Sequence, residues 1–246
     1  MRIDTYLLPA LLKDPERHVC IVIDVLRATS TLATLIARGV REVAVVAEIA
    51  HAFALRNAGD EAVRLLCGEI GGLPPAGFDH GNSPEEFARL ELAGKCAVLF
   101  TSNGTKALVR VAAAPAVFAG SLLNVSAAVR AALAEAEARS LDLALVCSGT
   151  ELGTAFSLED TFCAGALIAR ARELLPAAPQ IGDAAQAALR LYDSFGRDAE
   201  AAFAVAEHGR ALAALGLGAD LQFCAQIDRY DVAPRVQRRA ELLVVT

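Results

Sequence analysis

The sequence predicts an α/β fold, a layered, mostly parallel or mixed sheet with helices on both faces. Short apolar runs alternate with helical patterns along residues 1–175, as in βαβ units. Several runs, such as 19–23 and 143–147, are continuous Val, Ile and Leu segments typical of strands buried on both faces. Three runs end at clusters of hydroxyl, amide, glycine and acidic residues that directly precede a helical pattern, as in strand-to-helix turns.

The elements follow in order along the chain. Strands are predicted at 19–23, 42–47, 63–67, 96–100, 117–119, 143–147 and 241–245. Helices are predicted between them at 29–38, 49–58, 84–92, 106–113, 124–139 and 158–175.

The pattern changes after Pro176. Two alanine-rich helical segments at 183–195 and 198–215 are followed by a polar stretch at 226–239 and the closing apolar strand. We therefore expect residues 1–175 to form an α/β core that carries the site loops. Residues 176–246 should form a helical segment and a closing strand packed on that core.

Composition excludes several classes of protein. With 246 residues and 55% hydrophobic content, the chain can bury a large core. Its net charge is 23 − 29 = −6, so binding of nucleic acid through a broad basic surface is not expected. The short cluster of Arg235, Arg238 and Arg239 is interpreted as solvated surface. No run reaches the roughly 18 apolar residues of a membrane span. Residues 1–6 lack the apolar core of a signal peptide, so we expect a cytoplasmic protein without membrane contact.

The six cysteines are far apart, mostly within apolar strings, and include no CxxC pair. This pattern predicts reduced thiols in the core and neither structural zinc nor a disulfide framework. The cysteines are Cys20, Cys67, Cys96, Cys147, Cys163 and Cys224.

The three turn clusters lie at 24–31, 101–106 and 148–153, the last leading into 157–160. At the carboxyl edge of an open sheet, backbone N–H groups and helix N-termini favour anions. The clusters therefore predict an enzyme that acts on a phosphorylated or otherwise multiply anionic small molecule. Neither GxxxxGK[ST] nor GxGxxG occurs, which argues against nucleoside triphosphates and dinucleotides.

Asp24 is the most informative single residue. It ends an apolar run, where a charge is costly unless it has a partner or a metal ion. Arg27 follows three residues later, so a buried Asp24–Arg27 ion pair is one interpretation and a site role is the other, which we favour.

Acids at two helix starts also have two interpretations. The segments 83–86 and 157–160 have the pattern of helix caps, with serine first and an acid three residues later. Glu159 and Asp160 can nevertheless also hold a hydrated cation beside a glycine loop. For His80, between Asp79 and Gly81, a hydrogen-bonded loop role is favoured over general-base chemistry.

Four blocks carry a resemblance to a known family. The segments 24–31, 77–84, 101–107 and 156–161, in this order and spacing, resemble the signature blocks of the 2-phosphosulfolactate phosphatase (ComB-like) family. The similarity extends to 163–165, 209–210 and Asp228. One departure is Ser102, where the family pattern has a second threonine in Thr-Thr-Asn.

The resemblance implies an α/β phosphoric monoester hydrolase that depends on Mg²⁺. Its reaction would convert 2-phospho-3-sulfolactate to sulfolactate and phosphate, a step of coenzyme M biosynthesis in methanogens. Family members also occur in bacteria not expected to make coenzyme M, so a related phosphorylated 2-hydroxy acid stays open as the substrate.

Such a substrate carries several negative charges, which the site must neutralise. The expected catalytic residues are Asp24, Arg27 and Lys106. The expected metal ligands are Asp24, Glu69, Glu159 and Asp160. The expected substrate-binding residues are Asn82, Asn103, Gly104, Thr105, Ser148, Gly149 and Thr150.

Alternatives remain open at this point. Phosphatases that form an aspartyl-phosphate commonly carry a second acid two residues after the nucleophile, where this chain has Leu26. Direct attack by water is therefore favoured over Asp24 as nucleophile.

A non-catalytic binder of anionic metabolites on the same scaffold is the second possible function. The acids Asp24, Glu69, Asp79, Glu159 and Asp160 favour the enzyme, because an anion binder needs no such set. Both a monomer and a homodimer are compatible with the sequence.

Overall fold

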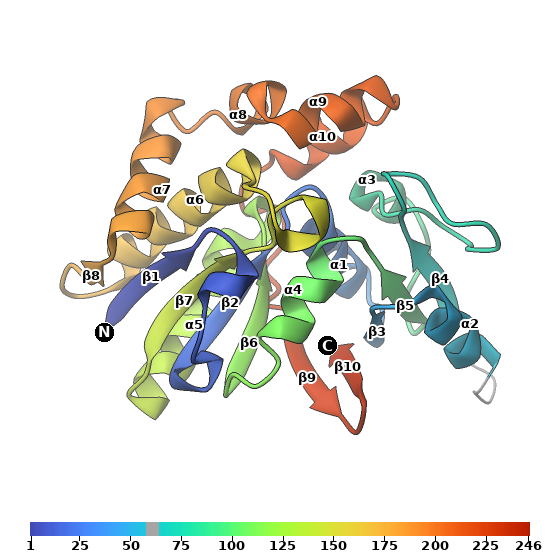
Figure 1. Cartoon of the computed structure of the whole chain (residues 1–246), viewed down its shortest axis with the longest axis horizontal. Helices are drawn as coiled ribbons and strands as arrows, with labels where there is room; N and C mark the ends of the chain where they lie inside the picture. The colour runs from blue at the N-terminus through green and yellow to red at the C-terminus, as the bar shows by residue number, and fades with distance from the viewer. Residues whose placement is uncertain (58–63) are drawn as a thin grey trace.

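The computed structural model describes residues 1–57 and 64–246, whose strands form a single ten-stranded mixed sheet (Figure 1). The order across the sheet is β4-β5-β3-β10-β9-β6-β2-β7-β1-β8. The strands are β1 (Arg2–Tyr6), β2 (His18–Ile23), β3 (Glu42–Val46), β4 (Arg64–Gly68), β5 (Cys96–Phe100), β6 (Ala116–Gly120), β7 (Asp142–Cys147), β8 (Gln180–Ile181), β9 (Arg235–Arg239) and β10 (Leu242–Val245).

The sheet consists of two parallel groups joined by an antiparallel hairpin. Strands β4, β5 and β3 pair in parallel, and so do β6, β2, β7, β1 and β8. Between them, β10 pairs antiparallel with β3 and β9, and β9 pairs antiparallel with β6. Figure 1 shows this hairpin between the two groups. The prediction of a mostly parallel or mixed sheet is thus confirmed, with the mixed character coming from the C-terminal hairpin.

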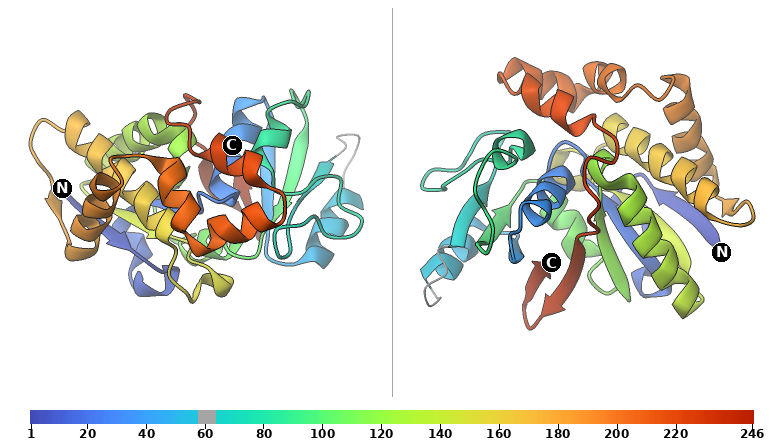
Figure 2. Two further views of the ribbon diagram at one scale, coloured as in Figure 1. Left: turned by 90° about the horizontal axis from the view of Figure 1, so that it is seen from above. Right: turned by 180° about the vertical axis from the view of Figure 1, so that it is seen from behind.

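Helices cover the sheet on both sides (Figure 2). One core cluster joins the strands to α5, α6 and α7, and a second joins them to α1, α3 and α4. The helices are α1 (Ala28–Ala37), α2 (Ile49–Asn57), α3 (Pro84–Phe87), α4 (Gly104–Arg110), α5 (Val125–Arg139), α6 (Leu158–Leu174), α7 (Asp183–Ser194), α8 (Ala199–Val205), α9 (Glu207–Ala214) and α10 (Gly218–Cys224). None of the helices in the described ranges is long and apolar enough to cross a bilayer.

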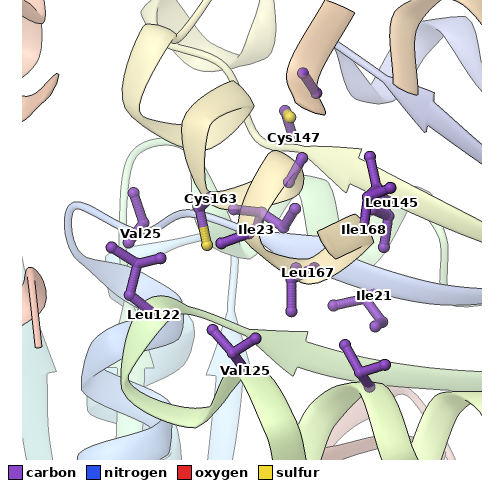
Figure 3. Close-up of a cluster of buried hydrophobic side chains, with 14 of the residues drawn as sticks. Ile21, Ile23, Val25, Leu122, Val125, Leu145, Cys147, Cys163, Leu167 and Ile168 are labelled. Carbon is purple, nitrogen blue, oxygen red and sulfur yellow. The ribbon is translucent and has the colours of Figure 1, made fainter. Parts of the chain in front are cut away.

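Strand β2 shows why both faces are apolar. Successive side chains of a strand point to opposite faces. Ile21 and Ile23 therefore enter the cluster with α5 and α6, part of which Figure 3 shows, whereas Cys20 and Val22 enter the cluster with α1 and α4. A continuous apolar run is what a strand covered on both faces requires.

The predicted elements are largely confirmed, with corrections to two helices and with three strands and one α-helix that the sequence analysis left out. The segment 198–215 is not one helix, because Ala206 is extended and separates α8 from α9. The helix predicted at 84–92 ends at Phe87, since the following turns are closed by bonds such as Arg89 N–H to Glu86 O. The elements left out are strands β1 and β8 near one edge of the sheet, strand β9 within the stretch 226–239, and helix α10. Ala58 and Val63, assigned above to a helix and a strand, lie outside the described residues.

The six cysteines are all buried, unpaired thiols, as predicted. Burial raises the pKa of Cys147, the thiol nearest the turn clusters, well above its ordinary value. This thiol therefore stays protonated, and the reactive thiolate is disfavoured. The cysteines therefore act as small apolar core residues.

Residues 176–246 contribute to several layers. Helix α7 packs on α6, where Phe162 makes edge contacts with Tyr192 and Phe195. Helices α8, α9 and α10 lie across the top of the molecule, over the ends of the strands (Figures 1 and 2). The chain then returns to the sheet as β9 and β10. We refer to residues 199–224, which hold α8 to α10, as the cap.

Candidate active site

A small pocket lies between the strand ends and the cap. It is lined by Asp24, Leu26, Arg27, Glu69, Gly72, Asn82, Asn103 and His208 and encloses about 20 Å³. A space of this size accommodates about one water-sized group. Asp24 directly follows β2, Glu69 follows β4 and Asn103 follows β5, so the polar turns of both parallel groups converge here.

Asp24 is buried at the base of this pocket, with 6% of its surface exposed. Its Oδ1 accepts a hydrogen bond from the backbone N–H of Ala28 at 3.2 Å, which orients the carboxylate at the start of α1. The pKa of Asp24 is raised to about 6, chiefly by burial and in smaller part by the charges of Glu69 and Glu159, whereas His208 and the Ala28 N–H oppose the rise. A carboxylate in this setting gains from a cation or a proton.

Arg27 is buried in the wall of the pocket. Its Nη1 donates to Asp220 Oδ2 at 2.6 Å, and its Nη2 donates to the carbonyl of Gly72 at 2.7 Å. Both charged side chains are 2% exposed. The structure therefore gives Arg27 a partner in α10, and the alternative of an Asp24–Arg27 ion pair is wrong.

Glu69 holds two turns together at the pocket rim. Its Oε1 accepts from Ser102 N–H at 2.7 Å, and its Oε2 accepts from Gly72 N–H at 2.9 Å. Ser102 follows β5, so this carboxylate connects the turns after β4 and β5. A carboxylate has further lone pairs for a ligand on the pocket side.

Asn82 supplies a buried acceptor without a partner. The side chain is 3% exposed, and among the described residues its Oδ1 has no hydrogen-bond donor. Buried polar atoms are almost always hydrogen-bonded in folded proteins. This amide oxygen, in the same pocket as Asp24 and Glu69, is therefore free to accept a hydrogen bond or to coordinate a cation.

Asp160 and Glu159 lie behind the pocket at the start of α6. Asp160 Oδ1 accepts from Val25 N–H at 3.0 Å, and its Oδ2 accepts from Ser148 Oγ at 2.9 Å and Gly149 N–H at 3.2 Å. Burial raises the pKa of Asp160 well above its ordinary value, and the charges of Asp24 and Glu159 add to this. Asp160 thus joins the ends of β2 and β7, and it takes up donors that the sequence analysis assigned to substrate.

The capping interpretation of this helix start is confirmed as well. Ser157 Oγ accepts from the Asp160 N–H at 3.1 Å. Ser83 caps α3 in the same way. Glu159 is buried, at 3% exposure, close enough for its charge to affect both Asp24 and Asp160.

The other predicted site residues divide into near and distant groups. Asn103 lines the pocket, and its Oδ1 accepts from Leu152 N–H at 2.8 Å. Gly104 abuts Asp24, whereas the Thr105 hydroxyl donates to the carbonyl of Thr101, just before α4. Thr150 bonds through its backbone to Ala155 and does not line the pocket, and Lys106 is exposed on α4 and does not line it either.

Two conspicuous residues from the sequence lie elsewhere. Asp79 pairs with Arg56 and accepts from Leu66 N–H at 2.8 Å. His80 Nδ1 lies 2.7 Å from Glu86 Oε1, the hydrogen-bonded loop role that we expected. Neither residue lines the pocket.

Sequence reasoning missed two polar residues that the cap contributes to the site: His208, which lines the pocket, and Asp220, which pairs with Arg27. His208 stands in the alanine-rich segment 198–215, Asp220 lies shortly after it, and no apolar strand ends beside either residue. The only signal near either is the resemblance at 209–210, which adjoins His208. The pairing of Asp220 with Arg27 spans 193 positions and has no local trace in the sequence.

The pocket residues fit a magnesium ion better than a zinc ion. Across residues 1–57 and 64–246, no three His, Cys, Asp or Glu side chains are close enough together to hold one ion. Zinc sites need such a set, whereas Mg²⁺ keeps several waters and is held by one or two carboxylates plus substrate phosphate. Asp24, Glu69 and the orphaned Asn82 Oδ1 are oxygen donors of the kind that Mg²⁺ takes.

Fold and pocket together define an α/β protein with an acidic, buried site at the strand ends and one fixed guanidinium. The family model of 2-phosphosulpholactate phosphatase matches residues 6–239. The chain belongs to this family, whose members are phosphoric monoester hydrolases.

Curated relatives match over nearly their whole length. A protein of Carboxydothermus hydrogenoformans is 36% identical over 100% of this chain and 97% of its own length. One of Synechocystis sp. is 39% identical over 96% of both chains, and one of Thermotoga petrophila is 37% identical over 89% of both. Each is named "Probable 2-phosphosulfolactate phosphatase".

Proposed function

We propose that the protein is a Mg²⁺-dependent phosphatase that hydrolyses 2-phospho-3-sulfolactate, or a closely related phosphorylated 2-hydroxy acid, to the hydroxy acid and phosphate. The family match over residues 6–239 and the names of the relatives support the reaction. The buried pocket with a fixed arginine among carboxylates supports it independently, because a phosphate ester needs both positive donors and a cation held by acids.

The residues of the chain have distinct roles in this proposal. Arg27, held from two sides, would present its remaining N–H donors to phosphoryl oxygens. Asp24, Glu69 and Asn82 would hold Mg²⁺, which neutralises phosphoryl charge and favours attack by water. Asp160 and Glu159 would not contact the substrate. Asp160 would instead fix the turns at Val25 and Ser148 behind the pocket.

We favour direct attack of water on phosphorus over a covalent intermediate on Asp24. The Asp24 carboxylate can orient the water by accepting its hydrogen bond. Incubation with beryllium fluoride and Mg²⁺ tests this, because a stable adduct on Asp24 would establish the aspartyl-phosphate route instead.

The pocket encloses too little space for a whole phosphosulfolactate, so the cap has to open for substrate entry. While it holds the substrate the pocket would have to be larger than this one, with the cap still limiting contact of the reacting phosphate with bulk water. The side chain of His208, on α9, would then face the bound substrate.

Phosphate release from a panel of phosphorylated 2-hydroxy acids, with and without Mg²⁺, tests the proposed function. We expect 2-phospho-3-sulfolactate or a close analogue to be hydrolysed only with Mg²⁺ or Mn²⁺, and a chelator to abolish turnover. Full turnover in excess EDTA after verified metal removal would exclude the magnesium role. Tight binding of the panel without turnover would favour the metabolite-binding alternative.

A further inference from the structure

Asp220 joins the cap to the site through Arg27. It lies in α10, is 2% exposed, and has both carboxylate oxygens engaged. Oδ2 accepts from Arg27 Nη1 at 2.6 Å. Oδ1 accepts from Ser83 Oγ at 2.7 Å and from Glu85 N–H at 3.3 Å, so one carboxylate joins the site arginine to the start of α3.

We propose that Asp220 is a positioning residue that orients the guanidinium of Arg27 for the phosphoryl group. The kinetic test of this inference rests on the proposed function, because it needs turnover of a phosphate ester. Arg27 stands at the N-cap of α1, and the contacts to Asp220 and the Gly72 carbonyl fix its planar head from two directions. A guanidinium has five N–H donors, so these two contacts leave others for a ligand in the pocket that Arg27 lines.

Charge explains why the partner is an aspartate. A buried guanidinium without a counter-ion is strongly unfavourable, and a neutral acceptor alone would leave its orientation free to follow any anion. Asp220 offers Arg27 a negative charge and one oxygen of a planar carboxylate, and its second oxygen is held by Ser83 and Glu85. The carboxylate is therefore held by α3 through one oxygen while its other oxygen holds Arg27.

A double-mutant cycle tests this role. Arg27→Lys keeps the charge but loses the guanidinium fork, and Asp220→Asn keeps the shape but loses the charge. If Asp220 acts through Arg27, Asp220→Asn should lower kcat/KM about tenfold or more in the wild-type background and about twofold or less in the Arg27→Lys background. Equal losses in both backgrounds, or wild-type kinetics of a folded Asp220→Asn variant, would overturn the proposal.

Two further variants separate positioning from folding. Glu135→Gln removes a carboxylate that pairs with Arg235 and Arg139 away from the pocket, and it should leave kcat/KM unchanged. A similar loss in Glu135→Gln would show general destabilisation and overturn the proposal. If Asp220→Asn does not fold, Asp220→Glu keeps the charge at a longer reach. It should melt close to wild type with a lowered kcat/KM, and an unchanged kcat/KM would again overturn the proposal.

Inorganic phosphate is the second probe, since its dissociation constant can be measured without turnover. In the same four proteins of the cycle, its binding should show the same coupling between Arg27 and Asp220. Coupled phosphate binding by a wild type that hydrolyses none of the esters would sustain the role of Asp220 and refute the proposed function. Turnover combined with additive effects would refute the role of Asp220 alone.

Discussion

At the scale of single residues, Asp24 combines burial with a polar task. Its carboxylate is 6% exposed among three other acids, an arrangement that costs stability unless a cation or proton is present. Function explains why the chain keeps this acid at the end of an apolar strand. Asp24→Asn should therefore fold, melt near or above the wild-type temperature, and lose about two or more orders of magnitude in kcat. Thermal unfolding and turnover decide together, since a destabilised variant with normal turnover would make Asp24 a structural residue.

The pH dependence of stability gives a second test of Asp24. Its pKa rises from 3.8 to about 6 on folding, so between these values the folded protein holds a proton that the unfolded chain has released. The stabilising contribution is fully present below pH 3.8 and is lost as the pH rises through about 6. In EDTA-treated protein, Asp24→Asn should gain up to about 2–3 kcal/mol in free energy of unfolding relative to wild type across this window. Denaturant titrations at pH 4 to 8 measure it, and a constant difference would contradict the shift.

The two predicted cationic residues differ in their surroundings. Arg27 is buried in the pocket wall, whereas Lys106 is exposed on α4. We expect Arg27→Ala to lower kcat/KM by an amount that corresponds to about 1.5–4 kcal/mol of lost transition-state stabilisation. The sequence analysis predicts a similar loss for Lys106→Ala. Near-wild-type kinetics of Lys106→Ala would remove this residue from the anion site, while near-wild-type kinetics of both would place the site elsewhere.

At the scale of elements, the start of α4 comes unusually close to Asp24. A Cβ added at Gly104 would lie 2.5 Å from Asp24 Oδ2 and 2.5 Å from the Cβ of Ala28. Gly104→Ala should therefore displace the carboxylate or the helix and lower kcat about tenfold or more, as small misplacements in a site do. Gly218 is the matched control, because it is also the first residue of a helix and has open space around it. Equal kinetics of Gly104→Ala and Gly218→Ala would contradict this close approach.

Local sequence patterns predicted most elements but not the ones that complete the site. Strand β2 is visible because both of its faces are apolar, and Asp24 is visible because it breaks that run. Strand β1 escaped notice because only Ile3 and Thr5 are buried and charged residues alternate with them. Asp220 could not be predicted, since nothing in the local sequence around this single acid indicates its pairing with Arg27, 193 positions away.

Close packing sets a further limit on what sequence shows. Gly165 lies in the middle of α6, where glycine ordinarily weakens a helix. A Cβ there would lie 2.2 Å from the carbonyl oxygen of Ala188 in α7, so the two helices approach each other through this residue. The pattern marks α6 as a helix, but only the partner helix explains the glycine.

At the scale of the whole molecule, the C-terminal hairpin holds the two parallel strand groups in one sheet. Leu243 of β10 pairs with Val45 of β3 and is buried, at 5% exposure, in the cluster that also contains α1 and α4. Strand β9 makes the contact to β6 on the other side. The site depends on this junction, because Asp24 comes from one group and Glu69 from the other.

Leu243→Ala tests whether the sheet folds as a unit. Removal of this buried side chain should lower the free energy of unfolding by about 2–5 kcal/mol. Since both strand groups share the hairpin, circular dichroism and near-ultraviolet absorption should report one transition with the same midpoint, shifted relative to wild type. Val109→Ala, at an exposed position of α4, is the control and should shift the midpoint little. Two separate transitions in Leu243→Ala, with only one of them shifted, would instead show that the two strand groups fold independently and that the site forms only when they dock.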